Sequence, residues 1–218
     1  MVNFRSRSNP AVVILGLGRF GMALGEELVH SGVEVMGIDT NPAVVDKASA
    51  ILTYAAVADT TSEEALRQLA VNEASRVVIG IGSDMGASLL TTSAVVEFNI
   101  PSIWAKALNN SHAKILKQIG AHHIIRPEQD TGRRIAHLMN GRVQEYAEFD
   151  RDYAIVKIAP PVSALGKKVS DFDRVQIIAV RPAGGMFRQS KPEMVLRSGD
   201  LILAAGNPDE LERFGTLD

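Results

Sequence analysis

A glycine-rich turn between an apolar strand and a helix narrows the possible folds of this chain more than any other part of its sequence. The apolar run Val12–Leu15 leads into Gly16-Leu17-Gly18-Arg19-Phe20-Gly21, and an amphipathic helical pattern follows directly. In a Gly-x-Gly-x-x-Gly turn, the first glycine makes the tight turn, the second lets a phosphate approach the backbone, and the third lets the helix pack on the strand. The helix N-terminus offers free N–H groups to an anion. The pattern therefore predicts a nucleotide site.

An acidic residue follows the second apolar strand, where a nucleotide-binding fold needs one. The second apolar run covers residues 33–38. Asp39 follows it directly, about 20 residues beyond the glycine turn. A carboxylate at this position is expected to accept hydrogen bonds from ribose hydroxyls, and its charge disfavours a 2′-phosphate. The turn, its flanking strand and helix, and the acidic residue together are a stronger signal than the glycines alone.

Strands and helices alternate through roughly the first 145 residues, in the rhythm of βαβ units. Six strands are expected, at residues 11–15, 33–38, 54–57, 76–81, 102–105 and 122–125. The Val and Ile run at 76–81 is almost uninterrupted, as is typical of a central parallel strand that is covered on both faces. We therefore expect an α/β fold with a Rossmann-like, doubly wound parallel sheet.

The pattern changes after the sixth strand. A helix over about 128–146 is expected to cross between domains or subunits. Strands at 154–158, 175–180, 186–188 and 201–205, a Gly184-Gly185 hairpin turn and a terminal helix at 208–214 predict a small α+β domain. The chain is thus divided into a disordered arm (1–10), a nucleotide-binding domain (11–130), a crossover helix and linker (131–149) and a C-terminal ligand or regulatory domain (150–218).

Composition excludes several classes of function. The formal net charge of −2 at pH 7 argues against binding to a nucleic-acid polymer, which needs a strong basic excess. The chain has no cysteine, so disulfides, thiolate catalysis and cysteine metal sites are excluded. No run approaches about 18 consecutive apolar residues, and residues 1–10 lack the apolar segment of a signal peptide. We therefore expect a cytoplasmic protein.

The predicted nucleotide site lies at the carboxyl ends of the parallel strands, where doubly wound sheets bind their ligands. Its predicted residues are Gly16, Gly18, Arg19, Phe20, Gly21, Asp39, Thr40, Asp59, Thr60, Gly80, Ile81, Gly82, Ser83 and Lys106. Asp59 follows the third strand, where it could meet the edge of an adenine. The alternative for Asp59-Thr60 is a plain turn with a helix cap, because these residue types are favoured there in any protein.

Two cations near the expected phosphates indicate the kind of nucleotide. Arg19 lies inside the turn, where a guanidinium can make charge-assisted contacts with a phosphate, and Lys106 follows the fifth strand. Both suit ATP or ADP better than the neutral nicotinamide half of NAD. The alternatives are a solvated charge at a helix start for Arg19 and an ordinary lysine near a strand end for Lys106.

Other titratable residues give weaker signals. Glu128, at the start of the predicted crossover helix, could bind a cation beside the phosphates, or it could be an acid favoured by the helix dipole. His122 and His123 are adjacent in a strand and point to opposite faces, so they cannot share a metal. Each of the five histidines is interpreted as hydrogen-bonded or exposed. No catalytic triad order, catalytic carboxylate pair or Walker motif is present, so we expect a sensor rather than an enzyme.

The combined motifs resemble a known family. Gly16 to Gly21, Ile38-Asp39, Ile103-Trp104-Ala105-Lys106-Ala107 and the run from Ile119 to Glu128 are similar to the regulator of K⁺ conductance (RCK) subunits of bacterial Ktr and Trk potassium uptake systems. The resemblance covers essentially the whole chain. It implies dimers that assemble as an octameric ring under an integral-membrane pore subunit, at the inner face of the membrane, and an ATP or ADP ligand whose exchange gates K⁺ flow.

The resemblance also assigns roles to single residues. Arg19 would reach the terminal phosphates, within one protomer or across a dimer interface, Asp39 the ribose, and Glu128 a divalent or monovalent cation. Some relatives bind cyclic di-AMP in the C-terminal domain. The corresponding apolar groove here would be formed by Ile177, Ile178, Arg181 and Pro192, but Pro182-Ala183 offers no polar side chain, which argues against that ligand.

Two other functions remain open at the level of sequence. An NAD(H)-sensing transport regulator would have the same fold and no chemistry. An NAD-dependent dehydrogenase would need a catalytic His, Lys or Tyr over the nicotinamide and a sizeable substrate domain, and neither is visible in the sequence.

Overall fold

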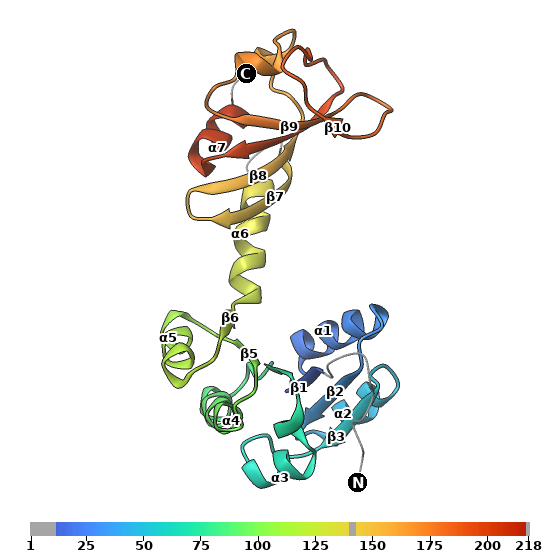
Figure 1. Cartoon of the computed structure of the whole chain (residues 1–218), viewed down its shortest axis with the longest axis vertical. Helices are drawn as coiled ribbons and strands as arrows, with labels where there is room; N and C mark the ends of the chain where they lie inside the picture. The colour runs from blue at the N-terminus through green and yellow to red at the C-terminus, as the bar shows by residue number, and fades with distance from the viewer. Residues whose placement is uncertain (1–11, 140–142, 217–218) are drawn as a thin grey trace. The chain divides into compact units, whose positions relative to one another are not determined.

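The chain forms two compact units, residues 1–127 and 128–218. The computed structural model describes residues 12–139 and 143–216, and Figure 1 shows the elements of each unit. The predicted disordered arm at 1–10 lies outside the described residues. Among the described residues, no helix combines the length and the apolar character needed to cross a bilayer.

The first unit is built on a six-stranded parallel sheet, as predicted. The strands are β1 (Val12–Leu15), β2 (Val35–Asp39), β3 (Tyr54–Val57), β4 (Arg76–Ile79), β5 (Ser102–Lys106) and β6 (His123–Ile125). Their order is β3-β2-β1-β4-β5-β6, and all neighbours are parallel. This order confirms the doubly wound fold. The topological switch lies between β1 and β4, whose carboxyl ends Leu15 and Ile79 are paired.

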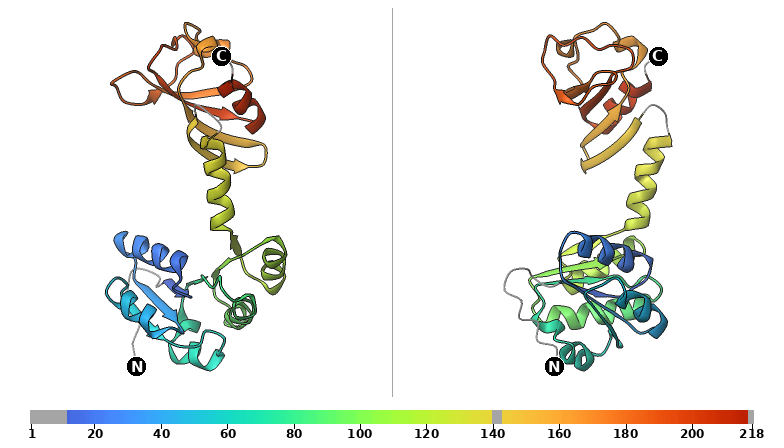
Figure 2. Two further views of the ribbon diagram at one scale, coloured as in Figure 1. Left: turned by 180° about the vertical axis from the view of Figure 1, so that it is seen from behind. Right: turned by 90° about the vertical axis from the view of Figure 1, so that its right-hand side faces the viewer.

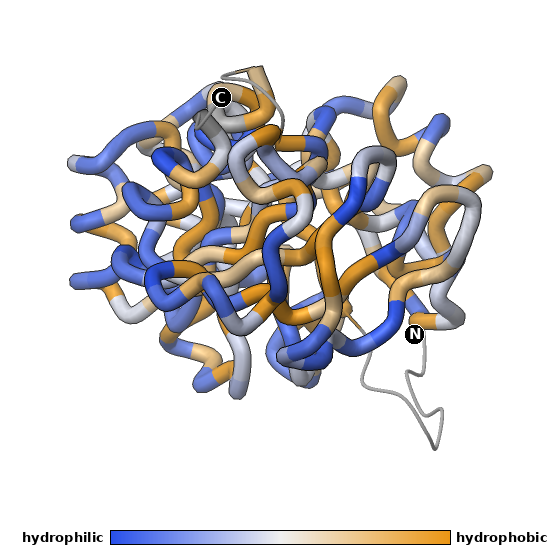
Figure 3. Tube along the Cα trace, turned by 90° about the horizontal axis from the view of Figure 1, so that it is seen from above, coloured by the Kyte–Doolittle hydropathy of each residue, from blue (hydrophilic) through white to orange (hydrophobic). Residues whose placement is uncertain are grey.

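Helices cover both faces of this sheet, as Figures 1 and 2 show. They are α1 (Arg19–His30), α2 (Pro42–Ser49), α3 (Glu63–Gln68), α4 (Met85–Glu97) and α5 (Asn110–Ile119), with a short 3₁₀ turn at Val71–Glu73. Alternate strand residues separate into two cores. Val13 and Leu15 pack in the core with residues of α3, α4 and α5, whereas Val12 and Ile14 pack in the core with residues of α1 and α2. Figure 3 shows the Cα trace of the chain coloured by hydropathy, with the hydrophobic stretches in orange.

The second unit contains a five-stranded antiparallel sheet and two helices. Its elements are α6 (Pro127–Met139), β7 (Val143–Asp150), β8 (Tyr153–Ile158), β9 (Gln176–Arg181), β10 (Arg188–Gln189), β11 (Leu201–Gly206) and α7 (Pro208–Thr216), with 3₁₀ turns at Val162–Ala164 and Val169–Asp171. The strand order is β10-β9-β11-β8-β7. The core is formed by Ile158, Leu196, Ile202, Leu211 and Phe214, which are all at least 95% buried.

The predicted helix over 128–146, and with it the linker at 131–149, is wrong in its second half. The helix α6 ends at Met139, and residues 143–150 form strand β7, which pairs antiparallel with β8. Tyr146 is buried opposite Val156, which anchors β7 to the core of the second unit. The spacing of Val143, Tyr146 and Ala147 imitates a helical pattern, whereas Asn140-Gly141 is a sequence signal that is typical of a turn.

The two edge strands of the second sheet, β10 and β7, differ in length and in charge. The strand β10 has only two residues and starts at Arg188, two residues later than predicted. The opposite edge strand β7 carries three acidic residues, Glu145, Glu148 and Asp150.

Next to β10, the strand β9 contains a bulge, because Leu203 pairs with Ala179 while Ala204 pairs with Ile177. Ile178 is the extra residue.

Candidate nucleotide-binding site

The glycine turn is pressed between the ends of β2 and β4. Gly16 N–H donates to the Ile38 carbonyl oxygen (2.8 Å), and Gly80 N–H donates to the Leu15 carbonyl oxygen (2.7 Å). Gly16 has φ +94°, and a Cβ atom on it would lie 2.9 Å from Cγ1 of Ile81. A Cβ atom on Gly80 would lie 2.8 Å from the Gly16 carbonyl oxygen. Glycine is therefore required on both sides of this contact.

The other two glycines of the turn differ in their surroundings. A Cβ atom on Gly21 would overlap the carbonyl oxygen of Gly16, so this glycine lets α1 pack on β1. Around the Cβ position of Gly18, in contrast, no atom lies within 4 Å. The second glycine thus faces open space at the start of α1, where a phosphate would have to approach.

The N-terminus of α1 has free hydrogen-bond donors. In the described part of this unit, α2 to α5 each begin with a side-chain cap, from Asn41, Ser62, Asp84 and Asn109. The helix α1 begins after Gly18 without a side-chain cap and has no acidic residue in its first turn. Its N–H groups and positive dipole end are therefore available to an anion. Arg19, the first residue of α1, is exposed, and its guanidinium forms no ion pair with any described residue.

Asp39 joins the end of β2 to the glycine turn. Its Oδ2 accepts a hydrogen bond from Leu17 N–H (2.8 Å) and its Oδ1 accepts one from Asn41 N–H (2.9 Å). Each carboxylate oxygen has a second acceptor position, so these bonds still allow contacts with hydroxyl groups. The carboxylate thus has a positioning role in the turn that the sequence did not indicate. Thr40 beside it is exposed.

Lys106 is the buried cation of the site. Its residue is only 8% exposed, and Nζ lies 5.8 Å from the ring centroid of Phe20. A Cβ atom on Gly82 would lie 3.2 Å from the same Nζ. The structure thus brings together the glycine turn, the loop after β4 and the end of β5. The alternative of an ordinary lysine near a strand end stays open, although a lysine is rarely as buried as this one.

The Asp59-Thr60 segment is a turn with internal hydrogen bonds. Asp59 Oδ1 accepts from Thr61 Oγ1 (2.7 Å) and from Thr61 N–H (2.9 Å), and these bonds lower the pKa of the Asp59 carboxyl. Thr60 is buried, and its hydroxyl lies 3.1 Å from that of Thr91 in α4. The geometry matches the plain turn, although the cap of α3 is Ser62. An adenine contact from Asp59 stays a prediction, as does a contact from the exposed Ser83.

Glu128 lies in the first turn of α6, in the second unit, and is exposed. Its role beside a nucleotide therefore stays a prediction. Among the described residues, no group of three or more His, Asp or Glu side chains is arranged to hold a metal ion.

The residues predicted for a C-terminal groove do not share one face of β9. Ile177 is 4% exposed and packs in the core of the second unit, which disfavours its place in an exposed groove, and the groove itself stays a prediction. The bulge at Ile178 brings Val180 back to the core side and leaves Ile178 and Arg181 partly exposed. The Arg181 guanidinium lies 5.4 Å from the ring centroid of Phe187. Pro192 is exposed, and its carbonyl oxygen accepts from Ser170 N–H.

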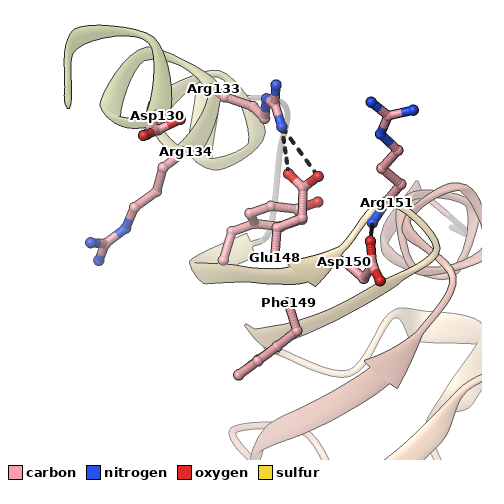
Figure 4. A pocket seen from close by; sticks show the side chains of 8 residues that line it. Asp130, Arg133, Arg134, Glu148, Phe149, Asp150 and Arg151 are labelled. Carbon is pink, nitrogen blue, oxygen red and sulfur yellow. Dashed lines mark hydrogen bonds and ion pairs between the residues drawn. The ribbon is translucent and has the colours of Figure 1, made fainter. Parts of the chain in front are cut away.

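A charged cavity of about 400 Å³ lies between α6 and β7. It is lined by Asp130, Arg133, Arg134, Tyr146, Glu148, Phe149, Asp150 and Arg151, and Figure 4 shows these side chains. Arg133 donates to both carboxylate oxygens of Glu148 (3.1 Å each), and Arg134 pairs with Glu145 (2.6 Å). Burial raises the pKa of the Tyr146 hydroxyl. The ion pairs connect α6 to β7. Arginines and acidic residues are equal in number among the residues that line the cavity, so neither charge is in excess there.

Comparison with known proteins identifies the family. Residues 12–127 match the TrkA-N domain, and residues 153–217 match the TrkA-C domain. The chain belongs to the Ktr/TrkA family of RCK proteins. It is 33% identical to Ktr system potassium uptake protein A of Bacillus subtilis (strain 168) over 212 residues, covering 94% of this chain and 96% of the relative. It is 34% identical over 204 residues to Ktr system potassium uptake protein A of Vibrio alginolyticus, covering 91% and 93%. These matches confirm the resemblance.

Solved structures show the same fold. The GsuK RCK domain aligns with a TM-score of 0.66 at 16% identity, covering 99% of this RCK chain and 49% of that chain. The GsuK channel bound to NAD aligns with a TM-score of 0.53 at 20% identity, covering 96% and 38%. GsuK bound to ADP aligns with a TM-score of 0.51 at 22% identity, covering 60% and 34%.

Proposed function

We propose that this RCK protein is the regulatory subunit of a potassium uptake system and gates a separate membrane pore in response to a nucleotide. The observation that supports the nucleotide site is the convergence of four features at one edge of the sheet. The uncapped N-terminus of α1, the open space at Gly18, the Asp39 carboxylate and the buried Lys106 all lie at the carboxyl ends of the parallel strands. Ktr system proteins A are the relatives that suggest the transport system. Through its pore subunit, the protein would lie at the inner face of the cell membrane.

The proposed ligand is ATP or ADP. Arg19 at the start of α1 and Lys106 at the end of β5 would place two cations beside a phosphate chain, and GsuK is a structural neighbour that binds ADP. The second candidate is an NAD(H)-sensing regulator, because GsuK also has an NAD complex. The exposed guanidinium of Arg19 would distinguish ATP from ADP, since a γ-phosphate adds charge that ADP lacks.

Gating would follow from a shift between conformations. A nucleotide changes the equilibrium between two conformations only by the difference in its affinity for them. We propose that dimers of this chain assemble as an octameric ring, whose shape changes when ADP replaces ATP. Glu128 would add a divalent or monovalent cation near the phosphates, so Glu128→Gln should remove the dependence of ATP affinity on that cation.

Exposed apolar residues on α4, on α5 and in the segment before α5 support the assembly. Leu90 on α4 is 62% exposed, and Leu108 and Ile115 at α5 are 44% and 37% exposed. The helix α4 has no charged residue before Glu97, which is unusual for a helix that faces water. Leu90→Asp should lower the molecular mass measured by light scattering. An unchanged mass would argue against assembly through this face.

Calorimetric titration with ATP, ADP, NAD and NADH tests the ligand. We expect the adenosine phosphates to bind more tightly than either dinucleotide. Tighter binding of NADH than of ATP would favour the second candidate, and no binding of any of the four would refute the nucleotide site.

Two variants test the residues. Arg19→Ala should weaken ATP more than ADP, and Asp39→Ala should weaken every adenosine nucleotide alike. Lys47→Ala, at the far end of α2, removes an exposed cation outside the site and should change neither affinity. Equal losses for ATP and ADP in Arg19→Ala would refute a terminal-phosphate contact.

A further inference from the structure

The segment that follows Lys106 is held by a buried histidine. Leu108 N–H donates to Nδ1 of His112 (3.2 Å), and His112 N–H donates to Oδ1 of Asn109 (2.9 Å), the cap of α5. Ala107 N–H donates to the Ile125 carbonyl oxygen (2.9 Å). These three hydrogen bonds fix the backbone between the end of β5 and the start of α5.

This segment lies against the nucleotide site. Measured from the Cβ position of Gly82, Nζ of Lys106 lies at 3.2 Å and Cδ2 of Leu108 at 3.7 Å. Both side chains therefore pack on the same glycine of the loop after β4. A shift of the Leu108 backbone would change the position from which the Lys106 ammonium reaches a ligand.

The His112 side chain can hold the segment only in its neutral form. Because Nδ1 accepts the Leu108 N–H, the ring proton must be on Nε2, and a second proton on Nδ1 would point at that donor. His112 is 0% exposed, and its Nε2 has no hydrogen-bond partner. Burial lowers the pKa of the His112 imidazole.

The charged groups near α5 would not compensate an imidazolium ion. Among the described residues, the elements with the most contacts to α5 contribute Glu97, exposed at the last position of α4, and His123 of β6, which is also exposed; Arg126, after β6, donates to Oδ1 of Asn110 at the start of α5 (2.6 Å). The helix α5 itself carries Lys114 and Lys117, and β5 carries Lys106. No carboxylate among the described residues is bonded to the ring. Protonation would thus place an uncompensated charge in the core.

We infer that His112 is a positioning residue of the nucleotide site, and that its protonation releases residues 106–109 and weakens nucleotide binding. The inference rests on the proposed function. Its sign follows from linkage: if the bound state requires neutral His112, binding releases a proton, and affinity falls as the pH drops below the ordinary range of histidine.

His122 provides a matched control. Its Nδ1 also accepts a backbone hydrogen bond, from Ile103 N–H (3.0 Å), but its residue is exposed. Water can solvate a charge on this ring. The two histidines therefore make the same kind of bond and differ in burial.

The test measures the Kd for ADP at about pH 8 and in steps down to about pH 4.5, because burial lowers the pKa of His112 from the ordinary histidine value. The proteins are the wild type, His112→Asn and His122→Asn. Asparagine keeps an acceptor oxygen near Nδ1 but does not titrate in this range. If binding lowers the histidine pKa by about one unit, the loss of affinity in the wild type relative to His112→Asn should grow on acidification and approach about tenfold at pH values below the pKa of the ring in both states. The titration of ADP itself cancels in this ratio. His122→Asn should follow the wild type, and a wild-type pH profile in His112→Asn would overturn the inference.

Hydrogen exchange on the ligand-free protein separates this inference from the proposed function. The protection factor of the Leu108 amide should fall on acidification in the wild type and stay constant in His112→Asn. If this holds but no nucleotide binds, the proposed function fails and the histidine-held segment stands. If nucleotides bind and the protection factor of the Leu108 amide does not change with pH, the inference fails. Should His112→Asn not fold, the wild type decides by itself: NMR should show that the Leu108 amide loses protection over the same pH range in which the His112 ring takes up a proton, and protection that stays constant over that range would overturn the inference.

Discussion

The two sheets of this protein place their loops differently. In the parallel sheet every strand ends at the same edge, so Gly16, Asp39 and Lys106 converge from three strands. In the antiparallel sheet the strand ends alternate between both edges, and charged side chains such as Arg133 and Glu148 pair with each other. The first arrangement gathers backbone donors and charged side chains at one edge of the sheet, whereas the second pairs charged side chains to join its own elements.

The helix starts show the same contrast on a smaller scale. The caps on α2 to α5 satisfy N–H groups within the fold, while the N–H groups of α1 are left for another partner. A cap stabilises a helix by about 1 kcal/mol, so its absence at α1 lowers stability where binding is proposed. The units can be followed separately, because the single tryptophan, Trp104, lies in β5 of the first unit.

The largest expected effect is a loss of unfolding free energy in the first unit alone. In Gly21→Val, the new side chain meets the Gly16 carbonyl oxygen, so we expect the loss of about 3 kcal/mol or more of unfolding free energy. Trp104 fluorescence in a denaturant titration should report it. Gly18→Ala is the control, since its Cβ enters open space and should change stability by less than about 0.5 kcal/mol. Equal midpoints for both variants would contradict the packing role of Gly21.

The reverse experiment would weaken the second unit. Ile202 is fully buried in β11, the middle strand of the antiparallel sheet, so Ile202→Ala should cost about 2–5 kcal/mol. Circular dichroism should detect the loss, while the Trp104 transition and the ADP affinity stay unchanged. Val162→Ala, at a residue 62% exposed, is the control. A shifted Trp104 transition would show that the two units unfold as one.

A smaller effect is expected from the cap of α5. Asn109→Ala removes the acceptor of the His112 N–H and should cost about 1 kcal/mol in the Trp104 transition. Gln118→Ala changes an exposed position on the same helix and should be nearly neutral. If both variants have the wild-type midpoint, the α5 cap contributes nothing measurable.

The smallest effect concerns the ion pairs of the second unit. A double-mutant cycle of Arg134→Ala and Glu145→Ala should give a coupling of about 0.2–1 kcal/mol, because both partners are more than half exposed. The coupling should decrease between about 0.02 M and about 0.5 M KCl as salt screens the charges. A coupling that persists in high salt would mean that the pair is less solvated than its exposure indicates.

Much of the fold could be predicted from sequence because local signals agreed in the first unit. Each parallel strand is a short apolar run followed by a turn and a helix start, and the observed strands differ from the predicted ones by at most two residues at either end. The strand β7 was missed because it is polar and half-exposed, so its apolar residues are too few to show alternation. Its pairing with β8 depends on tertiary contacts of Tyr146.

The candidate site was predictable only where a motif fixes it. The glycines and Asp39 follow from spacing along the chain. The burial of Lys106 and the Leu17 bond to Asp39 depend on residues brought together across several strands. His112 was interpreted as an ordinary histidine. Its position three residues after the helix cap Asn109 is a visible signal, but its burial is not.

The edges of the antiparallel sheet also limit how copies of this protein can meet. A two-residue strand such as β10 is a poor template for an added strand, and the opposite edge strand β7 carries charged side chains, two of which form ion pairs with α6. Aggregation by sheet extension is thereby disfavoured on both sides. An assembly of copies, if it forms as proposed, would therefore use side-chain surfaces, which can dissociate and re-form without exchanging backbone hydrogen bonds.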